Sequence, residues 1–222
     1  MKEFVLKTKR SKLHNSICTL SRFLLATLFK IAYRVQVIGL DNIPRKGRII
    51  LCSNHISYLD PLVIAAFLPR YIFFMAKREV FVNKFLASVV TFFNSFPVKR
   101  DGFDRQAVKY SISILNDEEV IGIFPEGTRS TDGVIRKGHR GVGLISIMAD
   151  CSILPVALSG TNKIIKKPYK RLFFPKVKIA FGKLIEIKKI VENNDNKTAT
   201  NIILSKTMDS IEDLYNKLNQ IK

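Results

Sequence analysis

Apolar segments of strand length alternate with segments of helical character through most of this sequence. Continuous apolar runs with the composition of buried strands occupy residues 48–53, 119–124, 153–159 and 177–181, and a shorter one lies at 35–39. Segments with helical features occupy residues 61–68, 104–115, 138–149 and 202–221. This alternation is typical of a layered α/β fold, so we predict a mixed sheet flanked by helices.

The first 34 residues differ from the rest of the chain. A basic stretch precedes an apolar segment, residues 17–33, which Arg22 and Lys30 interrupt. This segment is shorter and more charged than the roughly 20 apolar residues of a transmembrane helix. We predict a helix lying in the membrane interface, and an ordinary amphipathic helix packed on the core is the alternative. The apolar side chains expected on one side of this helix are Phe23, Leu24, Leu28 and Ile31.

The charge of the chain indicates a polyanionic partner. Its 222 residues include 37 basic and 18 acidic side chains, a formal net charge of +19. Nucleic acid, anionic lipid and an acidic carrier protein all fit this charge. Ten basic residues lie within residues 161–189, with Tyr169, Phe173 and Phe174 among them, which is typical of either a solvated loop or a membrane-facing patch.

The cysteines and histidines give no sign of a metal site. Cys18, Cys52 and Cys151 have no paired spacing, and the chain has only three histidines. A zinc site needs a cluster of such ligands at short spacing. We therefore predict no metal.

The sequence NHISYLDP, residues 54–61, follows the apolar run 48–53 directly. An imidazole can accept a proton from an alcohol when a carboxylate orients it, which makes His55 and Asp60 candidate catalytic residues. On one helix their side chains would point in different directions. They can meet only if His55 lies in the turn and Asp60 begins the helix, as Pro61 favours. The alternative is that Asp60 is simply a helix N-cap.

The sequence FPEGTRS, residues 124–130, follows the apolar run 119–124 in the same way. Gly127 would let a ligand approach the backbone, which is a candidate for stabilising an oxyanion. Arg129 offers a fork of donors for phosphate. Glu126 would either orient Arg129 or receive an acceptor hydroxyl. A polar turn with a local ion pair is the alternative.

These two motifs, in this order, resemble the glycerolipid acyltransferase family, and within it the bacterial 1-acyl-glycerol-3-phosphate acyltransferases. Two weaker blocks are also similar, residues 96–100 with Arg100 at the family's arginine, and residues 154–157. The resemblance runs from residue 35 to 183, roughly two thirds of the chain. The chain departs from the family pattern at Asn94 or Ser95, where glycine is usual, and at His139 and Arg140, where a small residue is usual.

The resemblance implies an acyltransferase domain over residues 35–222, with residues 1–34 resting on the cytoplasmic face of the cell membrane as a peripheral or monotopic element. It implies transfer of a fatty acyl group from acyl-CoA or acyl carrier protein to the sn-2 hydroxyl of lysophosphatidic acid, without a cofactor. His55 would be the general base and Asp60 its support. Residues expected to bind the acceptor phosphate are Arg129, Glu126, Gly127, Thr128, Arg100 and Lys137.

Several alternatives stay open within and outside this family. Glycerol-3-phosphate or another lysophospholipid could be the acceptor. The apolar region 71–96 could hold the acyl chain through Phe73, Phe74 and Phe92, or could be plain core. A non-catalytic lipid-binding or nucleic-acid-binding protein would also explain the charge. We expect no nucleic acid partner, because no base-reading module is visible in the sequence.

Overall fold

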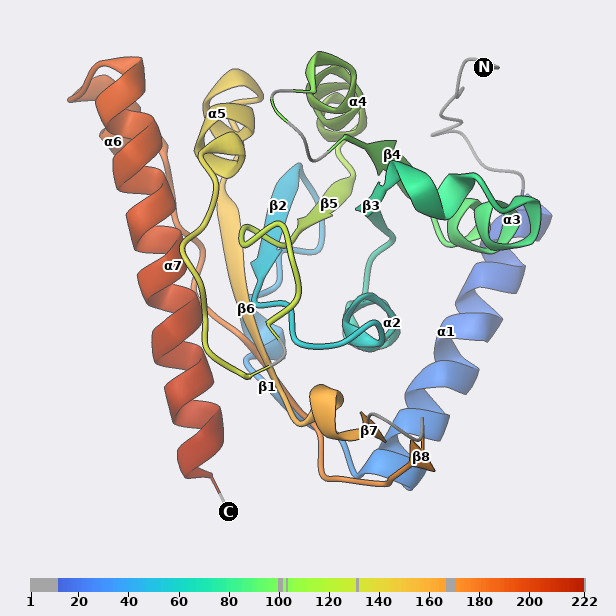
Figure 1. Cartoon of the computed structure of the whole chain (residues 1–222). Helices are drawn as coiled ribbons and strands as arrows, with labels where there is room; N and C mark the ends of the chain where they lie inside the picture. Colours follow the sequence, from blue (N-terminus) through green and yellow to red (C-terminus); the bar gives the residue numbers. More distant parts are fainter. Residues whose placement is uncertain (1–11, 100–101, 103, 131, 167–170, 222) are drawn as a thin grey trace.

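The computed structural model describes residues 12–99, 102, 104–130, 132–166 and 171–221. At its centre is a seven-stranded sheet with the order β1-β9-β6-β2-β5-β3-β4 (Figure 1). The strands of this sheet are β1 (Gln36–Ile38), β2 (Ile49–Ser53), β3 (Ile72–Lys77), β4 (Ser95–Val98), β5 (Val120–Ile123), β6 (Ile153–Ser159) and β9 (Lys178–Phe181). The predicted runs thus become β1, β2, β5, β6 and β9.

The sheet is mixed, as predicted. Strands β6, β2, β5, β3 and β4 run parallel to one another. Strand β9 is antiparallel to β6, and β1 is parallel to β9. Because β9 starts opposite the end of β6, the carboxyl ends of the five parallel strands and the amino ends of β1 and β9 meet at one edge, which we call the catalytic edge.

Helices cover both faces of the sheet (Figure 1). They are α1 (Lys12–Tyr33), α2 (Asp60–Phe67), α3 (Lys84–Phe92), α4 (Arg105–Asn116), α5 (Gly141–Met148), α6 (Lys188–Glu192) and α7 (Asn196–Gln220). One apolar core joins α1 and α2 to the sheet, and a second joins α4, α5, α6 and α7 to it. Alternation along β2 supplies both cores, since Leu51 belongs to the first and Ile50 to the second.

Two polar caps explain where α4 and α7 begin. The carboxylate of Asp104 accepts hydrogen bonds from the backbone N–H groups of Gln106 and Ala107, so the N-cap is the first residue of the predicted segment 104–115. Asp195 caps α7 in the same way through Lys197 and Thr198. Helix α7 therefore begins six residues before the predicted start at residue 202.

Helix α1 is longer than the predicted segment and has an apolar side in contact with the protein. Its stretch Asn15–Tyr33 is long and apolar enough to cross a membrane, a test that a core helix or a signal sequence also passes. Phe29 and Tyr33 are buried in the first core. The side chains predicted on one side are all exposed: Phe23, Leu24, Leu28 and Ile31. The helix thus packs on the core, as the alternative expected, but through Phe29 and Tyr33, while the predicted apolar side faces away from it.

Candidate active site

The two sequence motifs meet at the catalytic edge. Strands β2 and β5 are parallel neighbours, so the segments that follow them leave the sheet at the same edge. The backbone N–H of His55 donates to Oε1 of Glu126 at 3.0 Å, and the N–H of Ser130 donates to the carbonyl of His55 at 2.7 Å. These two bonds join the motifs at the histidine.

His55 and Asp60 form a buried pair. Nδ1 of His55 lies 2.8 Å from Oδ2 of Asp60, whose side chain is fully buried at the start of α2. The same oxygen accepts the backbone N–H groups of Ile56 and Ser57, both at 2.7 Å. The prediction that the histidine lies in the turn and the aspartate begins the helix is confirmed. The N-cap alternative is wrong, because the N-cap of α2 is Leu59 and Asp60 reaches back to the turn.

These contacts assign the tautomer of His55. Oδ2 of Asp60 is an acceptor for two N–H groups, so Nδ1 of His55 carries a hydrogen and donates it to the same oxygen. Nε2 then keeps its lone pair and is the basic atom of the ring. The ring also stacks on Phe124, with centroids 4.0 Å apart and planes at 19°. The imidazole is held on its Nδ1 side and on one face.

Thr161 is a partner of this pair that the sequence did not indicate. Its buried hydroxyl donates to Oδ1 of Asp60 at 2.6 Å, so both carboxylate oxygens are hydrogen-bonded. Gly160, which precedes it after β6, has a φ of 89°, and a Cβ there would lie 2.3 Å from the carbonyl oxygen of Lys176. Glycine therefore allows the turn that carries Thr161 toward Asp60.

Asn54 holds the start of the catalytic turn against the neighbouring strand. Its buried side-chain amide donates to the carbonyl of Leu158 at 2.9 Å, and its Oδ1 accepts the N–H of Leu158 at 2.8 Å. The side chain thus replaces a backbone pair beyond the end of β2. We infer that the asparagine of the first motif fixes the position at which His55 leaves the sheet.

Glu126 has a positioning role that the sequence did not suggest. Its buried carboxylate accepts the backbone N–H of His55 at Oε1 and that of Arg136 at Oε2, at 3.0 and 2.9 Å. Burial raises the pKa of Glu126, and these two bonds oppose the rise. Both oxygens accept backbone N–H groups, so Glu126 positions the loop; its predicted contacts with Arg129, an acceptor hydroxyl or the phosphate stay predictions.

The structure brings only some of the other residues predicted to bind phosphate into contact with the site. The guanidinium carbon of Arg129 lies 3.4 Å from the ring centroid of Tyr58, a cation–π contact between the two motifs. Thr128 lines a cavity described below and is exposed, as is Lys137. Arg100 lies outside the described residues.

The glycine of the second motif is explained by its backbone and by His139. Gly127 has a φ of 66°, and a Cβ there would lie 2.9 Å from the imidazole of His139. A side chain at this position would therefore be strained and crowded. Its own N–H donates to the carbonyl of Phe124 at 3.0 Å, so this amide is not free to bind an oxyanion.

A cavity of about 480 Å³ lies beside Phe124. Its wall includes Met75, Val98, Val108, Ile123 and Val142, from β3, β4, α4, β5 and α5. It has the size of a typical ligand pocket and a mainly apolar wall. Phe124 borders this cavity and also stacks on the imidazole of His55. The cavity and the histidine are therefore both in contact with the same ring.

None of the three phenylalanines predicted to hold the acyl chain lines this cavity. Phe73 and Phe74 are buried in the second and first cores, and Phe92 packs edge-on against Phe93 in the α3 region. Phe73 and Phe74 are therefore core residues, as the alternative expected. Their alternation along β3 sends the two rings to opposite faces of the sheet.

The cysteines offer no nucleophile at this site. Cys52 precedes the catalytic turn but is completely buried, and burial raises the pKa of its thiol far above the ordinary value. Burial also raises the pKa of Cys151, to about 12. A thiol of this kind is inert because the thiolate is the reactive form. Within the described residues, no group of three His, Cys, Asp or Glu side chains is placed to hold a metal ion.

Comparison with known proteins agrees with this arrangement. The family model described as Acyltransferase matches residues 34–159, which is more than half of the chain and includes both motifs. The chain belongs to the acyltransferase family. This acyltransferase is similar to proteins named 1-acyl-sn-glycerol-3-phosphate acyltransferase, at 32% identity in Bacillus subtilis (58% of this chain) and 34% in Streptococcus pneumoniae (72% of this chain).

Each of these two alignments covers only part of the related protein. The two alignments cover 64% and 59% of the relatives, so the acyltransferase chain matches less than two thirds of their length. A crystal structure of the 1-acyl-sn-glycerophosphate acyltransferase from Thermotoga maritima has the same fold. Its TM-score is 0.75 at 23% identity, over 94% of this chain and 84% of the other.

Proposed function

We propose that this protein transfers a fatty acyl group from an acyl thioester to the free sn-2 hydroxyl of 1-acyl-glycerol-3-phosphate. The observation that carries the proposal is the buried pair of His55 and Asp60, joined by backbone to the second motif of an acyltransferase-family chain. The names of the related proteins suggest the acceptor. Glycerol-3-phosphate or another lysophospholipid is the second candidate.

The proposed reaction is a direct transfer with His55 as general base. Nε2 accepts the proton of the acceptor hydroxyl while its oxygen attacks the thioester carbonyl. The carbon–sulfur bond then breaks, and the proton on His55 passes to the departing thiolate. Asp60 stabilises the positive charge that forms on the imidazole in between. The donor is acyl-CoA or acyl carrier protein, and no cofactor or metal takes part.

Arg129 would bind the acceptor phosphate. It stands next to Ser130, whose backbone is bonded to His55, so its guanidinium begins within a short reach of the base. Stacking on Tyr58 limits the directions of its donors before the phosphate arrives. Arg100 and Lys137 stay candidates for additional contacts with the phosphate.

The cavity beside Phe124 would hold the acyl chain in place of the phenylalanines first considered. Its apolar wall suits a hydrocarbon, and its position one ring from His55 suits a chain attached to the reacting carbonyl. The exposed apolar side of α1 would rest on the cytoplasmic leaflet of the membrane, where the acceptor is found. The cavity would keep the acyl chain of the donor out of water, and the membrane would do the same for the hydrocarbon chain of the acceptor.

The proposal is tested with the purified full chain on phospholipid vesicles. Lysophosphatidic acid, glycerol-3-phosphate and lysophosphatidylcholine are offered in turn, each with acyl-CoA and with acylated acyl carrier protein, and the product lipid is identified. We expect phosphatidic acid from lysophosphatidic acid. Acylation of glycerol-3-phosphate alone would replace the proposed acceptor, and no product with any pair would contradict the activity.

Thr161 gives a first prediction about the positioning of the catalytic pair. Thr161→Val keeps the side-chain shape but leaves Oδ1 of Asp60 buried without its donor. We expect kcat to fall about tenfold with both KM values nearly unchanged, as for other residues that orient a catalytic group. Thr161→Ser should restore most of kcat because it restores the hydroxyl. Steady-state kinetics check this, and equal losses in the Val and Ser variants would contradict it.

A further inference from the structure

A small hairpin projects from the chain between β6 and β9. Its strands are β7 (Ile165–Lys166) and β8 (Arg171–Leu172), which pair antiparallel, and we call residues 163–166 and 171–176 the basic hairpin. Three of its large apolar side chains are half exposed: Ile165, Leu172 and Phe174, at 46, 53 and 56%. Lys163 and Lys176 are exposed at its two ends. Apolar side chains bordered by lysines are unusual for a purely solvated loop.

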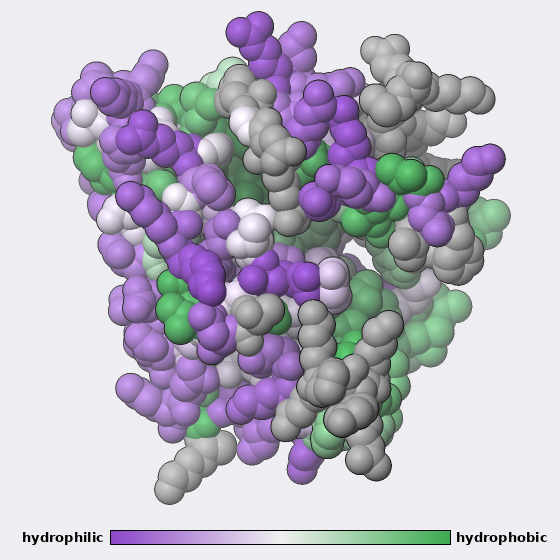
Figure 2. All heavy atoms as spheres, in the orientation of Figure 1, coloured by the Kyte–Doolittle hydropathy of each residue, from purple (hydrophilic) through white to green (hydrophobic). Residues whose placement is uncertain are grey.

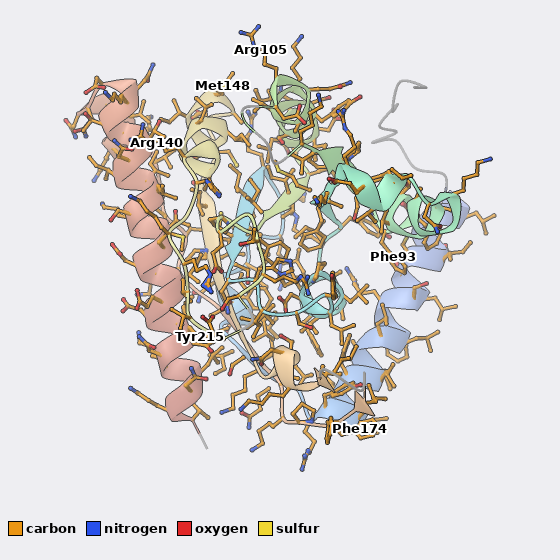
Figure 3. The ribbon with its side chains drawn as sticks, in the orientation of Figure 1. Phe93, Arg105, Arg140, Met148, Phe174 and Tyr215 are labelled. Carbon is orange, nitrogen blue, oxygen red and sulfur yellow. The ribbon has the colours of Figure 1, made fainter. Side chains whose placement is uncertain are left out.

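The basic hairpin is attached to the end of α1. The rings of Tyr33 and Phe174 stack with centroids 5.6 Å apart, and Arg34 donates to the carbonyl of Phe174 at 3.3 Å. The N–H of Val177 donates to the carbonyl of Tyr33 at 3.0 Å. Figure 3 shows Phe174 beside the carboxyl-terminal end of α1. The exposed apolar side of α1 therefore continues into the hairpin.

Both elements are joined to the catalytic edge of the sheet. The basic hairpin follows β6 after the short helix Thr161–Lys163, whose first residue is bonded to Asp60. Helix α1 is followed by β1, whose first residue, Gln36, pairs with Lys178 at the start of β9. Since β9 starts opposite the end of β6, the end of α1, the hairpin and the catalytic turn lie at the same edge.

The charge of this region indicates the sign of its partner. Neither residues 12–33 nor residues 161–182 contain an aspartate or a glutamate, whereas residues 163–178 contain seven lysines and arginines. Figure 2 shows hydrophobic side chains gathered along the α1 side of the molecule, while the α7 side is mostly hydrophilic. Apolar side chains that enter an interface, bordered by basic side chains, match a bilayer with anionic headgroups.

We propose that the basic hairpin and the exposed side of α1 form one surface that docks on an anionic bilayer, with Leu172 and Phe174 entering the interface. The inference rests on the proposed function, in which α1 alone meets the membrane. Two contacts fix the orientation of the protein on the bilayer, which one helix does not. The catalytic edge is then held toward the lipid, so a lysophospholipid reaches His55 from the bilayer.

The absence of tryptophan from the whole sequence permits a direct test. Single reporters are introduced as Phe174→Trp in the hairpin, Phe23→Trp in α1 and Met148→Trp at the end of α5. Met148 is 54% exposed and lies toward the opposite edge of the sheet (Figure 3), so it is the matched control. Each full-length variant is mixed with vesicles of phosphatidylglycerol and phosphatidylcholine, with brominated lipid as a quencher.

We expect the emission of Phe174→Trp and Phe23→Trp to shift to shorter wavelength and to be quenched by brominated lipid, and that of Met148→Trp to change little. If only Phe23→Trp is quenched, the hairpin inference is overturned while membrane binding by α1 stands. If neither is quenched, the surface does not meet lipid, and a protein or nucleic acid partner must be sought. Reporter variants keep an aromatic ring at each phenylalanine site and so preserve most of the packing.

Affinity gives a second measurement. The double variant Leu172→Ser, Phe174→Ser should bind these vesicles about tenfold or more weakly than the unmodified chain, since two apolar side chains leave the interface. Met148→Ser should bind as the unmodified chain does. Circular dichroism establishes that the variants are folded. Unchanged vesicle binding by a folded double variant would overturn the inference.

Discussion

Replacing His55 with alanine is expected to lower turnover by about a hundredfold or more, with little change in melting temperature. The substitution removes Nε2, the only basic atom that the pair presents. The backbone bonds that join the two motifs remain, because they use the N–H and carbonyl of His55 and not its ring. Asp60 also keeps the N–H groups of Ile56 and Ser57 and the hydroxyl of Thr161.

Asp60→Asn should lower turnover by a similar factor for a different reason. An asparagine oxygen can still accept the N–H groups of Ile56 and Ser57, so the turn is largely kept. The substitution removes the negative charge that stabilises the imidazolium of His55 during the transfer. The double variant should be hardly slower than His55→Ala alone, because residues that act as a unit are not additive.

Asp195→Asn is the matched control for this carboxylate. Asp195 also accepts backbone N–H groups at the start of a helix, but it caps α7 far along the sequence from the motifs. Its amide variant should keep normal turnover. Steady-state kinetics and thermal denaturation compare the variants. If Asp60→Asn were as active as Asp195→Asn, the carboxylate would only shape the turn, and His55 would need another partner.

The strands that the sequence predicted well are those with clear boundaries. Residues 153–159 form β6 as predicted, and the run at 48–53 becomes β2 with one residue fewer. No element was predicted at residues 71–96, where β3, α3 and the start of β4 lie. Apolarity there is continuous across a strand, a helix and a second strand, so neither periodicity stands out. Pro97 also argues against a strand at β4, because proline lacks the N–H of a strand interior. Strand β4 lies at the edge of the sheet, where a missing N–H is tolerated.

The site was predictable where it is local in sequence. His55 and Asp60 are five residues apart, so turn and helix geometry alone decided whether they could meet. Thr161 is 101 residues from Asp60, and only the parallel order of β2 and β6 brings it there. The role of Glu126 depended on two backbone N–H groups, which no residue type reveals. Contacts that depend on the order of the strands or on backbone groups could therefore not be predicted from the sequence.

Replacing Arg129 with alanine is expected to raise the acceptor KM by about ten- to a hundredfold, because a charged hydrogen bond worth roughly 1.5–3 kcal/mol is lost. The donor KM should change little. Arg129→Lys should restore part of the loss, since a lysine keeps the charge but lacks the fork of donors. Tyr58→Leu is the matched control for the stacking contact, because it removes the ring while the guanidinium remains.

A monoacylglycerol, which lacks the phosphate, separates phosphate binding from every other effect of this substitution. If Arg129 binds the phosphate, the unmodified enzyme should prefer lysophosphatidic acid strongly, and Arg129→Ala should lose much of this preference. Its kcat/KM for monoacylglycerol should stay within a few fold of the unmodified value, because no phosphate contact exists to be lost. Tyr58→Leu should keep most of the preference. An Arg129→Ala enzyme equally impaired on both acceptors would assign the arginine to the structure of the loop, leaving the phosphate to Lys137, Arg100 or another group.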